Sequence, residues 1–167
     1  ACAVESAKGA ALTVHGRTAR DFFRGTADWS RIAEVKGALK HIPLIGNGDI
    51  DSPDKAVDAF RHYGVDGVMI GRAVLGRPWL FAQVHAALQG REIPPEPSLT
   101  QQRDILLEHF QLVLERYGSE KGTLLMRRFA CQYARGKHSA RAFRNKAGRV
   151  TTSEEFYDAV NNYYPVE

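Results

Sequence analysis

The first half of the chain repeats one pattern, in which a short apolar run ends in a polar turn and an amphipathic stretch follows. Apolar runs predict three strands, at residues 11–14, 42–46 and 65–70. Between the last two, apolar residues recur at helical spacing after Ser52, a favoured N-cap, and the pattern stops at Gly64, a favoured C-cap. Strand, helix and strand in this order form the unit of a parallel sheet. The pattern therefore predicts an α/β architecture for residues 1–90.

Two more helices are predicted, one on either side of that unit. Asp28 caps the first of them. Its apolar stripe consists of Trp29, Ile32, Val35 and Leu39. The second helix spans residues 78–89, and its inward side chains are predicted to be Leu80, Phe81, Val84 and Leu88. Both helices are therefore expected to pack against the sheet.

Burial is also predicted for two strands and for one aromatic group. The strands at residues 42–46 and 66–70 are nearly all apolar, which is typical of strands buried on both faces. Phe22, Phe23 and Trp29 lie near one loop and suggest a base-stacking platform. Aromatic clusters more often pack inside proteins, so we predict lid or core packing for these three residues.

The second half of the chain is predicted to be helical. Residues 91–97 contain three prolines and form an extended linker. Amphipathic stretches then predict four helices, at residues 98–117, 122–134, 138–147 and 152–164, with Pro165 as the end of the last. The predicted organisation is thus an α/β domain at residues 1–90, a linker, and a small all-α four-helix bundle at residues 98–167.

Composition is typical of a soluble globular protein, with 44% hydrophobic and 25% charged residues. No apolar run approaches the roughly 20 residues that span a bilayer, and the first residues do not form a secretory signal. Cys2 and Cys131 are far apart and have no metal-ligand spacing. We therefore expect reduced thiols, no bound metal, no membrane association and a cytoplasmic protein.

Glycine and polar residues follow the second and third strands, at the strand ends where parallel α/β folds bind ligands. Glycine lacks a Cβ, so Gly48 and Gly71 can let backbone N–H groups approach a phosphate closely. Arg72 can add charge-assisted hydrogen bonds. Spacing alone leaves two interpretations open, a phosphate site and a pair of ordinary turns.

The net charge is only +4, but the positive residues are unevenly distributed. Residues 121–149 contain nine Lys or Arg and no Asp or Glu. A charged block is usually a solvated surface, yet a salt-bridged helix face carries alternating signs and this block does not. Binding of phosphates is therefore the hypothesis for six of these residues, namely Arg127, Arg128, Arg135, Lys137, Arg141 and Arg144.

Five segments together resemble the tRNA-dihydrouridine synthases, most of all the bacterial B type. They are LTVHGRT at 12–18, GTADW at 25–29, IGNGDI at 45–50, GVMIGRAVLGRPWLF at 67–81 and HFQLVLERYGSEKG at 109–122. The resemblance implies that the chain holds the C-terminal strands and helices of a TIM (β/α)8 barrel, followed by a helical tRNA-binding domain. It also implies that the first strands, the catalytic cysteine and a flavin-contacting lysine lie upstream of this segment.

The reaction implied by the resemblance is the reduction of a tRNA uridine to 5,6-dihydrouridine. In that family NADPH reduces FMN, the reduced flavin passes hydride to the uridine, and a cysteine supplies the proton. Cys2 and Cys131 lie outside the family's cysteine motif, and we expect both to be structural. The segment alone is therefore expected to be inactive, and the protein is expected to be a monomer.

The resemblance also implies which residues meet the cofactor and the substrate. The expected FMN contacts are His15, Asn47, Gly48, Asp49, Gly71 and Arg72. The Asn47 amide suits the flavin ring edge or the ribityl chain, and Asp49 is expected to accept a ribityl hydroxyl or to fix its turn. Arg17 is expected on the substrate side, and the six cations of residues 121–149 are expected to bind tRNA.

Two other functions fit the same residues. One is an FMN- or phosphate-binding TIM-barrel oxidoreductase that acts on a small molecule, although a basic helical domain after the barrel argues against it. The other is a non-catalytic RNA-binding remnant. Flavin binding and RNA binding by the chain distinguish these alternatives.

Overall fold

The computed structural model describes residues 1–22 and 24–164 and forms two compact units. The first unit comprises Ala1–Val74 and Pro78–Pro94, and the second comprises Leu75–Arg77 and Pro95–Glu167. The change from one unit to the other after Pro94 falls within residues 91–97, which carry no helix or strand. The packing predicted for Phe23 and the helix end predicted at Pro165 lie outside the described residues.

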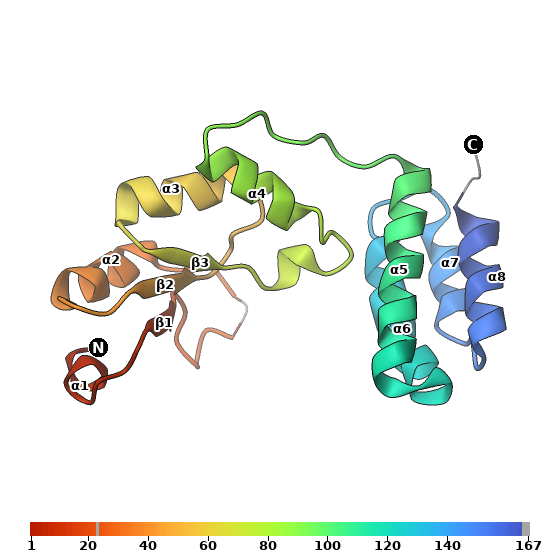
Figure 1. Ribbon diagram of the computed structural model, residues 1–167, viewed down its shortest axis with the longest axis horizontal. Helices are drawn as coiled ribbons and strands as arrows, with labels where there is room; N and C mark the ends of the chain where they lie inside the picture. Colours follow the sequence, from red (N-terminus) through yellow and green to blue (C-terminus); the bar gives the residue numbers. More distant parts are fainter. Residues whose placement is uncertain (23, 165–167) are drawn as a thin grey trace. The chain divides into compact units, whose positions relative to one another are not determined.

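The first unit is built on a three-stranded parallel sheet in the order β1-β2-β3 (Figure 1). The strands are β1 (Leu12–His15), β2 (Leu44–Asn47) and β3 (Gly67–Met69). The helices of this unit are α1 (Cys2–Ser6), α2 (Trp29–Ala38), α3 (Pro53–Tyr63), the short 3-10 helix η1 (Arg72–Val74) and α4 (Leu80–Leu88). The predicted strand–helix–strand order and the parallel pairing are confirmed.

Local sequence explains where the helices of this unit begin and end. The Asp28 side chain accepts a hydrogen bond from the Arg31 N–H, and Ser52 accepts one from the Lys55 N–H, so both predicted N-caps are confirmed. Gly64 ends α3 in the left-handed conformation, with φ 65° and ψ 20°. These signals are local in the chain, which is why the pattern of residues was sufficient to predict them.

The core of the first unit lies between one face of the sheet and three helices. Buried Leu44, together with Leu12, Val14 and Val68 from the sheet, packs with residues of α2, α3 and α4. The register aligns His15, Asn47 and Met69 in a row on the opposite face, where the Met69 residue is 47% exposed. The prediction that the strands are buried on both faces is therefore wrong for this structure, because all three helices pack against one face.

Helix α4 also differs from its prediction. It begins at Leu80 rather than at residue 78, and its buried residues are Leu80, Gln83, Val84 and Ala86. Phe81 and Leu88 were predicted to point inward, but they are 53% and 39% exposed. A helical step of about 100° per residue places Phe81 beside the buried stripe rather than on it.

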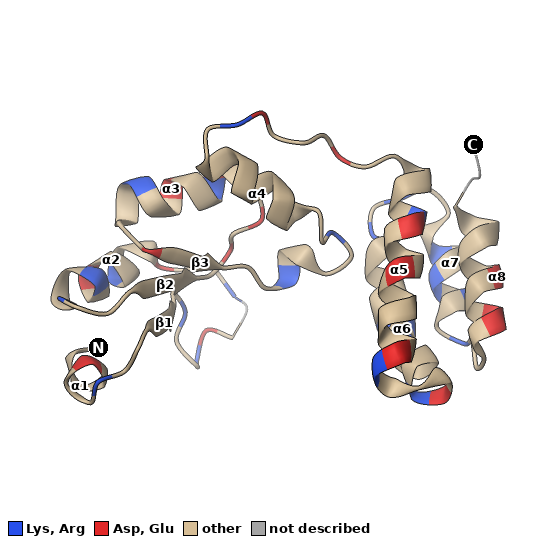
Figure 2. Cartoon of the chain, in the orientation of Figure 1, with Lys and Arg blue, Asp and Glu red and all other residues tan. Residues whose placement is uncertain are grey.

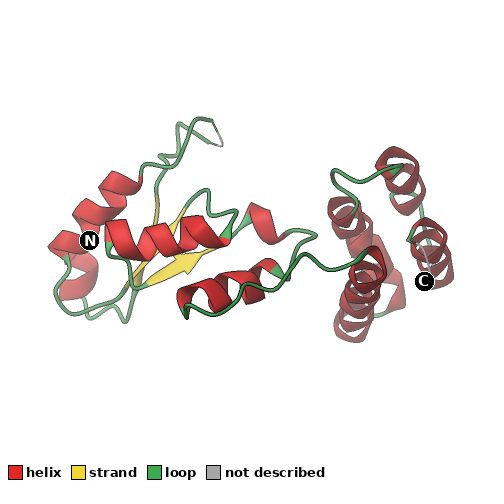
Figure 3. Ribbon diagram, turned by 90° about the horizontal axis from the view of Figure 1, so that it is seen from above, coloured by secondary structure: helices red, strands yellow, loops and turns green. Residues whose placement is uncertain are grey.

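In the part of the second unit that the structure describes, the regular elements are helices joined by loops (Figure 3). Its four helices are α5 (Leu99–Tyr117), α6 (Ser119–Tyr133), α7 (Ala140–Ala147) and α8 (Ser153–Tyr163). Ser98 and Gln101 form a capping box at the start of α5. Aromatic rings fill the interior, and the Phe110 and Phe156 rings lie 3.9 Å apart between centroids. No helix in residues 1–22 or 24–164 is long and apolar enough to cross a membrane.

Candidate functional site

The carboxyl ends of the three strands bring the predicted cofactor residues to one edge of the sheet. His15 pairs in register with Asn47, and Asn47 with Met69, whose carbonyl accepts a 2.7 Å hydrogen bond from the Asn47 amide. Gly48 follows with φ 135°, and a Cβ there would lie 3.4 Å from His15 Nδ1 and 2.4 Å from the Ala27 Cβ. Only glycine fits this position, so the His15 ring rests directly beside the turn that follows β2.

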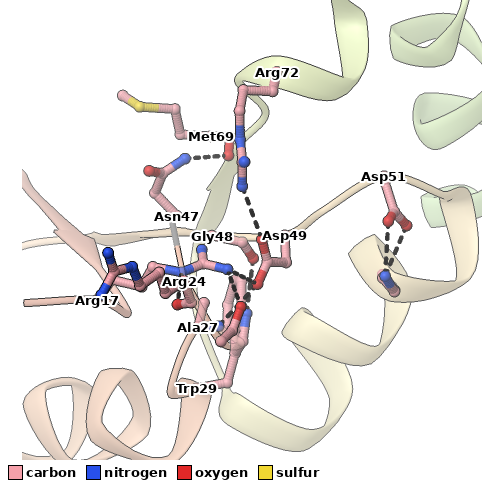
Figure 4. Close-up of polar contacts among 12 residues, drawn as sticks. Arg17, Arg24, Ala27, Trp29, Asn47, Gly48, Asp49, Asp51, Met69 and Arg72 are labelled. Atoms are coloured by element: carbon pink, nitrogen blue, oxygen red, sulfur yellow. Dashed lines mark hydrogen bonds and ion pairs between the residues drawn. The ribbon is translucent and has the colours of Figure 1, made fainter. Parts of the chain in front are cut away.

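Asp49 joins three loops that are distant in the sequence (Figure 4). Its Oδ2 accepts hydrogen bonds from Arg17 at 2.7 Å and from the Ala27 N–H at 2.8 Å. Its Oδ1 lies 3.2 Å from Arg72. The loops after β1, β2 and β3 are therefore held together by a single carboxylate.

The charge state of Asp49 follows from these contacts. Burial alone would raise the pKa of Asp49, but the hydrogen bonds from Arg17 and Ala27 and the positive charges of Arg17 and Arg72 outweigh it. The pKa of Asp49 is therefore below its ordinary value. The carboxylate is ionised at neutral pH, so it can accept hydrogen bonds but cannot donate one.

Arg17 lies inside the loop that follows β1 rather than at its surface. Its side chain is only 5% exposed, and it donates hydrogen bonds to the carbonyls of Arg24 and Gly25 as well as to Asp49. Its Nη1 is buried without a hydrogen-bond partner in the part of the chain that the structure describes. The structure thus gives Arg17, which the sequence suggested for the substrate side, a role in holding this loop.

Gly71 and Arg72 lie at the open side of the same edge. A Cβ built on Gly71 would meet no atom within 4 Å among the described residues. The Arg72 side chain is 56% exposed, and its Nη2 contacts Asp49. Open space beside a glycine, next to a solvent-accessible guanidinium, is an arrangement that fits a phosphate group.

Trp29 supports this site, whereas the sequence predicted only lid or core packing for it. Its indole N–H donates to the Gly48 carbonyl at 2.9 Å, while its ring packs against the core of the unit. A Cβ on Gly46 would lie 2.5 Å from that ring, so Gly46 makes room for it. The GTADW segment was the available signal, because it contains both Trp29 and Ala27, whose N–H holds Asp49.

Two of the six cations suggested for RNA binding in the second unit make internal contacts. Arg127 donates from Nε to the Val150 carbonyl at 2.7 Å. Lys137 donates from Nζ to the Tyr133 carbonyl. Burial lowers the pKa of Lys137, an effect that the Glu96 carboxylate opposes. Both side chains therefore stabilise the fold of this unit.

The other four cations are Arg128, Arg135, Arg141 and Arg144, and all of them are exposed. Within residues 1–22 and 24–164, none of the four has an ion pair in the structure. Figure 2 shows basic residues without acidic ones on α7, whereas α8 carries acidic residues. These four guanidinium groups are available to an anionic partner.

Both cysteines are free thiols. Cys2 is exposed, and Cys131 is partly buried with its thiol 3.8 Å from the Arg144 carbonyl. Burial raises the pKa of the Cys131 thiol and keeps it protonated at neutral pH. Among the residues whose positions are described, no three His, Cys, Asp or Glu side chains are grouped to hold a metal ion.

Comparison with known proteins identifies relatives of this chain. The family model described as dihydrouridine synthase (Dus) matches residues 1–165. The tRNA-dihydrouridine synthase B of Xanthomonas campestris pv. campestris is 44% identical over 156 residues, which are 93% of this chain and 46% of that protein. A probable tRNA-dihydrouridine synthase of Mycobacterium leprae is 39% identical over 151 residues, 90% of this chain and 39% of that protein. The chain spans about half the length of the first of these relatives and less of the second.

Proposed function

This chain belongs to the dihydrouridine synthase family, and from that membership we propose that it forms the flavin-phosphate and tRNA-binding part of an FMN-dependent tRNA-dihydrouridine synthase. The observation that carries the proposal is the strand edge at which Asp49 joins the loops of Arg17, Ala27 and Arg72. Parallel barrels bind phosphate at this end of their last strands. The relatives named as tRNA-dihydrouridine synthases support tRNA as the substrate.

The positions of the side chains support the proposed cofactor contacts. Gly71 and Arg72 are assigned to the FMN phosphate, because the first leaves open space and the second carries an exposed positive charge. His15 and Asn47 are assigned to the flavin ring or the ribityl chain, because they share a row on the face of the sheet that no core helix covers. Asp49 and Gly48 hold the turn between these two groups.

FMN, when bound, provides hydride transfer from NADPH to the uridine. The residues of this chain bind its phosphate and orient it, and we assign the proton donor to a residue outside this chain. Three strands form an open sheet rather than a closed barrel. The chain by itself is therefore proposed to bind ligands without turning over tRNA, and turnover by the isolated chain with tRNA, FMN and NADPH contradicts this part of the proposal.

RNA binding is assigned to the second unit. Arg128, Arg135, Arg141 and Arg144 are exposed and carry no ion pair with the rest of the described chain, so they can neutralise phosphates. A uridine must leave its base stack before it can reach a flavin inside a barrel. Contacts to the RNA backbone hold the substrate while that base is extruded, and they act on any tRNA sequence.

The test compares FMN with riboflavin, which lacks the phosphate. Wild-type chain is expected to bind FMN more tightly than riboflavin, in a titration followed by flavin fluorescence. Arg72→Ala is expected to weaken FMN binding about tenfold, because a charge-assisted hydrogen bond is lost, and to leave riboflavin binding unchanged. Gly71→Val is expected to have a similar effect, because its side chain enters the space assigned to the phosphate.

Arg31→Ala is the matched control, since Arg31 is a 75% exposed arginine on α2 whose ion pair is with the neighbouring Asp28. Equal FMN affinity in wild type, Arg72→Ala and Gly71→Val contradicts the phosphate assignment. Flavin binding without tRNA binding would favour a small-molecule oxidoreductase. Binding of tRNA without flavin would favour an RNA-binding remnant.

A further inference from the structure

The loop between β1 and α2 is held at both of its ends. At its start the Asp21 carboxylate accepts hydrogen bonds from the Thr18 N–H at 2.8 Å and from the Thr18 hydroxyl at 2.7 Å. At its end the buried Arg17 side chain donates to the carbonyls of Arg24 and Gly25. Side chains that project from this loop are thereby presented from a fixed base.

Phe22 projects from this loop into solvent. Its residue is 74% exposed, the largest exposure among the large hydrophobic residues that the structure describes as exposed. Its φ of 48° is unusual for a bulky side chain, and strained backbone of this kind often marks a functional segment. Of the two positions predicted for Phe22, lid or core, its exposure excludes the core, whereas Trp29 from the same predicted cluster does pack against the core.

Two cations flank this aromatic side chain in the sequence. Arg20 and Arg24 are both exposed, and neither side chain has an ion pair with any residue whose position is described. Asp21 is the acidic residue between these two arginines, and its carboxylate is engaged by Thr18. An exposed aromatic ring with unpaired arginines on either side is the combination with which proteins bind single-stranded nucleic acid.

We infer that Arg20, Phe22 and Arg24 form a contact surface for single-stranded RNA, in which Phe22 stacks on a base and the two arginines meet neighbouring phosphates. The inference rests on the proposed RNA substrate and adds a second contact region, in the first unit. The loop follows β1 directly after His15 and Arg17, so it lies at the strand edge assigned to the flavin. A uridine extruded toward that edge leaves neighbouring bases unstacked, and an exposed aromatic ring can replace the lost stacking.

The experiment uses the full chain and two RNA probes of equal length. One probe is an oligouridine of about ten nucleotides, a length typical of single-strand binding sites. The other has the same ribose-phosphate backbone without bases. Wild type is expected to bind the oligouridine about tenfold more tightly than the abasic probe, because stacking is available only to the first.

Three variants of Phe22 separate stacking from apolar contact. Phe22→Ala and Phe22→Leu are expected to bind both probes with the same affinity as wild type binds the abasic probe. Phe22→Trp is expected to restore the preference for the oligouridine. Because the side chain is exposed, none of these changes removes a core contact, and thermal unfolding of each variant checks this point.

The arginines are tested by the salt dependence of binding. Arg20→Ala combined with Arg24→Ala is expected to reduce the slope of log affinity against log salt by about 1.4 for both probes, because each lost phosphate contact contributes about 0.7 on single strands. The preference for bases over the abasic backbone is expected to remain in this variant. Arg31→Ala is again the control, and it is expected to leave the slope unchanged.

Three results overturn the inference. The first is an unchanged preference for oligouridine in Phe22→Ala, and the second is a preference retained by Phe22→Leu. The third is the absence of RNA binding by wild type, which also removes the RNA part of the proposed function. Absence of FMN binding with RNA binding intact contradicts only the proposed flavin site. The experiment therefore distinguishes failure of the flavin assignment from failure of the Phe22 contact.

Discussion

The two units differ in what their charged side chains do. At the strand edge of the first unit, Arg17 and Arg72 both contact Asp49. At the amino ends of the strands, Lys36 contacts Asp66 at 2.6 Å. In the second unit, the cations of α7 have no acidic partner among the residues that the structure describes, and aromatic rings fill the interior instead. A paired arginine fixes the chain, whereas an unpaired one is available to a ligand. Counting positive residues therefore says little until their partners are known.

The largest change in stability is expected when an aromatic ring is removed from the interior of the second unit. Phe156→Ala is expected to lower the free energy of unfolding of the second unit by about 4 kcal/mol, because a fully buried ring is lost and a cavity remains. Phe81→Ala in the first unit is the matched control, and with a 53% exposed ring it is expected to change stability by less than about 0.5 kcal/mol. Hydrogen exchange of the α5 amides measures the stability of the second unit, and exchange of the α4 amides measures that of the first. Equal losses of stability in Phe156→Ala and Phe81→Ala would show that the packing of Phe156 is misassigned.

The next largest change in stability is expected when the Asp49 carboxylate is removed from the strand edge. Asp49→Ala is expected to destabilise the first unit by about 3 kcal/mol, because the nearly buried Arg17 loses its counter-charge. Asp51→Ala removes an exposed pair with Lys55 and is expected to cost less than about 0.5 kcal/mol. The measurement is urea unfolding followed by tryptophan fluorescence, since both tryptophans lie in the first unit and the Trp29 indole contacts Gly48 beside the altered turn. Similar losses in the two variants would mean that Asp49 is only a surface charge.

Sequence was sufficient for features determined by neighbours along the chain. The caps at Asp28 and Ser52, the parallel strands and the four helices of the second unit follow from local residue patterns. The partner of Arg17 was not predictable, because Asp49 lies 32 residues away and reaches it only through the pairing of β1 with β2. The exposure of Phe81 was missed for the same reason, since an aromatic side chain is buried only where another element covers it.

A smaller effect separates two adjacent arginines of α6. Arg127→Ala is expected to lower the stability of the second unit by about 1–2 kcal/mol, because the Val150 carbonyl loses a charged donor, and to leave RNA affinity nearly unchanged. Arg128→Ala is expected to leave stability unchanged and to reduce the slope of log affinity against log salt by about one on tRNA. Chemical unfolding and tRNA titrations at several salt concentrations check both variants. If Arg127→Ala changed RNA affinity and Arg128→Ala changed stability instead, exposure and pairing would not identify the RNA-binding cations.

The smallest effect concerns pH, and it depends on one histidine of the second unit. Burial lowers the pKa of His109, whose Nδ1 lies 3.3 Å from the Tyr133 hydroxyl and whose ring packs near Phe129. Burial and the Glu108 charge raise the pKa of Tyr133 to about 12, so the tyrosine stays neutral over the range of interest. Below about pH 6.5 His109 becomes protonated in the unfolded chain, whereas in the folded unit it stays neutral to a lower pH.

The stability of the second unit should therefore decline as the pH falls from about 7 to about 5, while the first unit should not change over this range. Hydrogen bonds and opposite charges lower the pKa values of Asp49 and Asp66, so their contribution is present at neutral pH and is lost only below about pH 4. Hydrogen exchange of α6 and α3 amides at a series of pH values measures the two units. In His109→Gln the decline in the second unit should disappear, because the titrating group is gone. A decline that persists in this variant would assign the acid sensitivity to a residue other than His109.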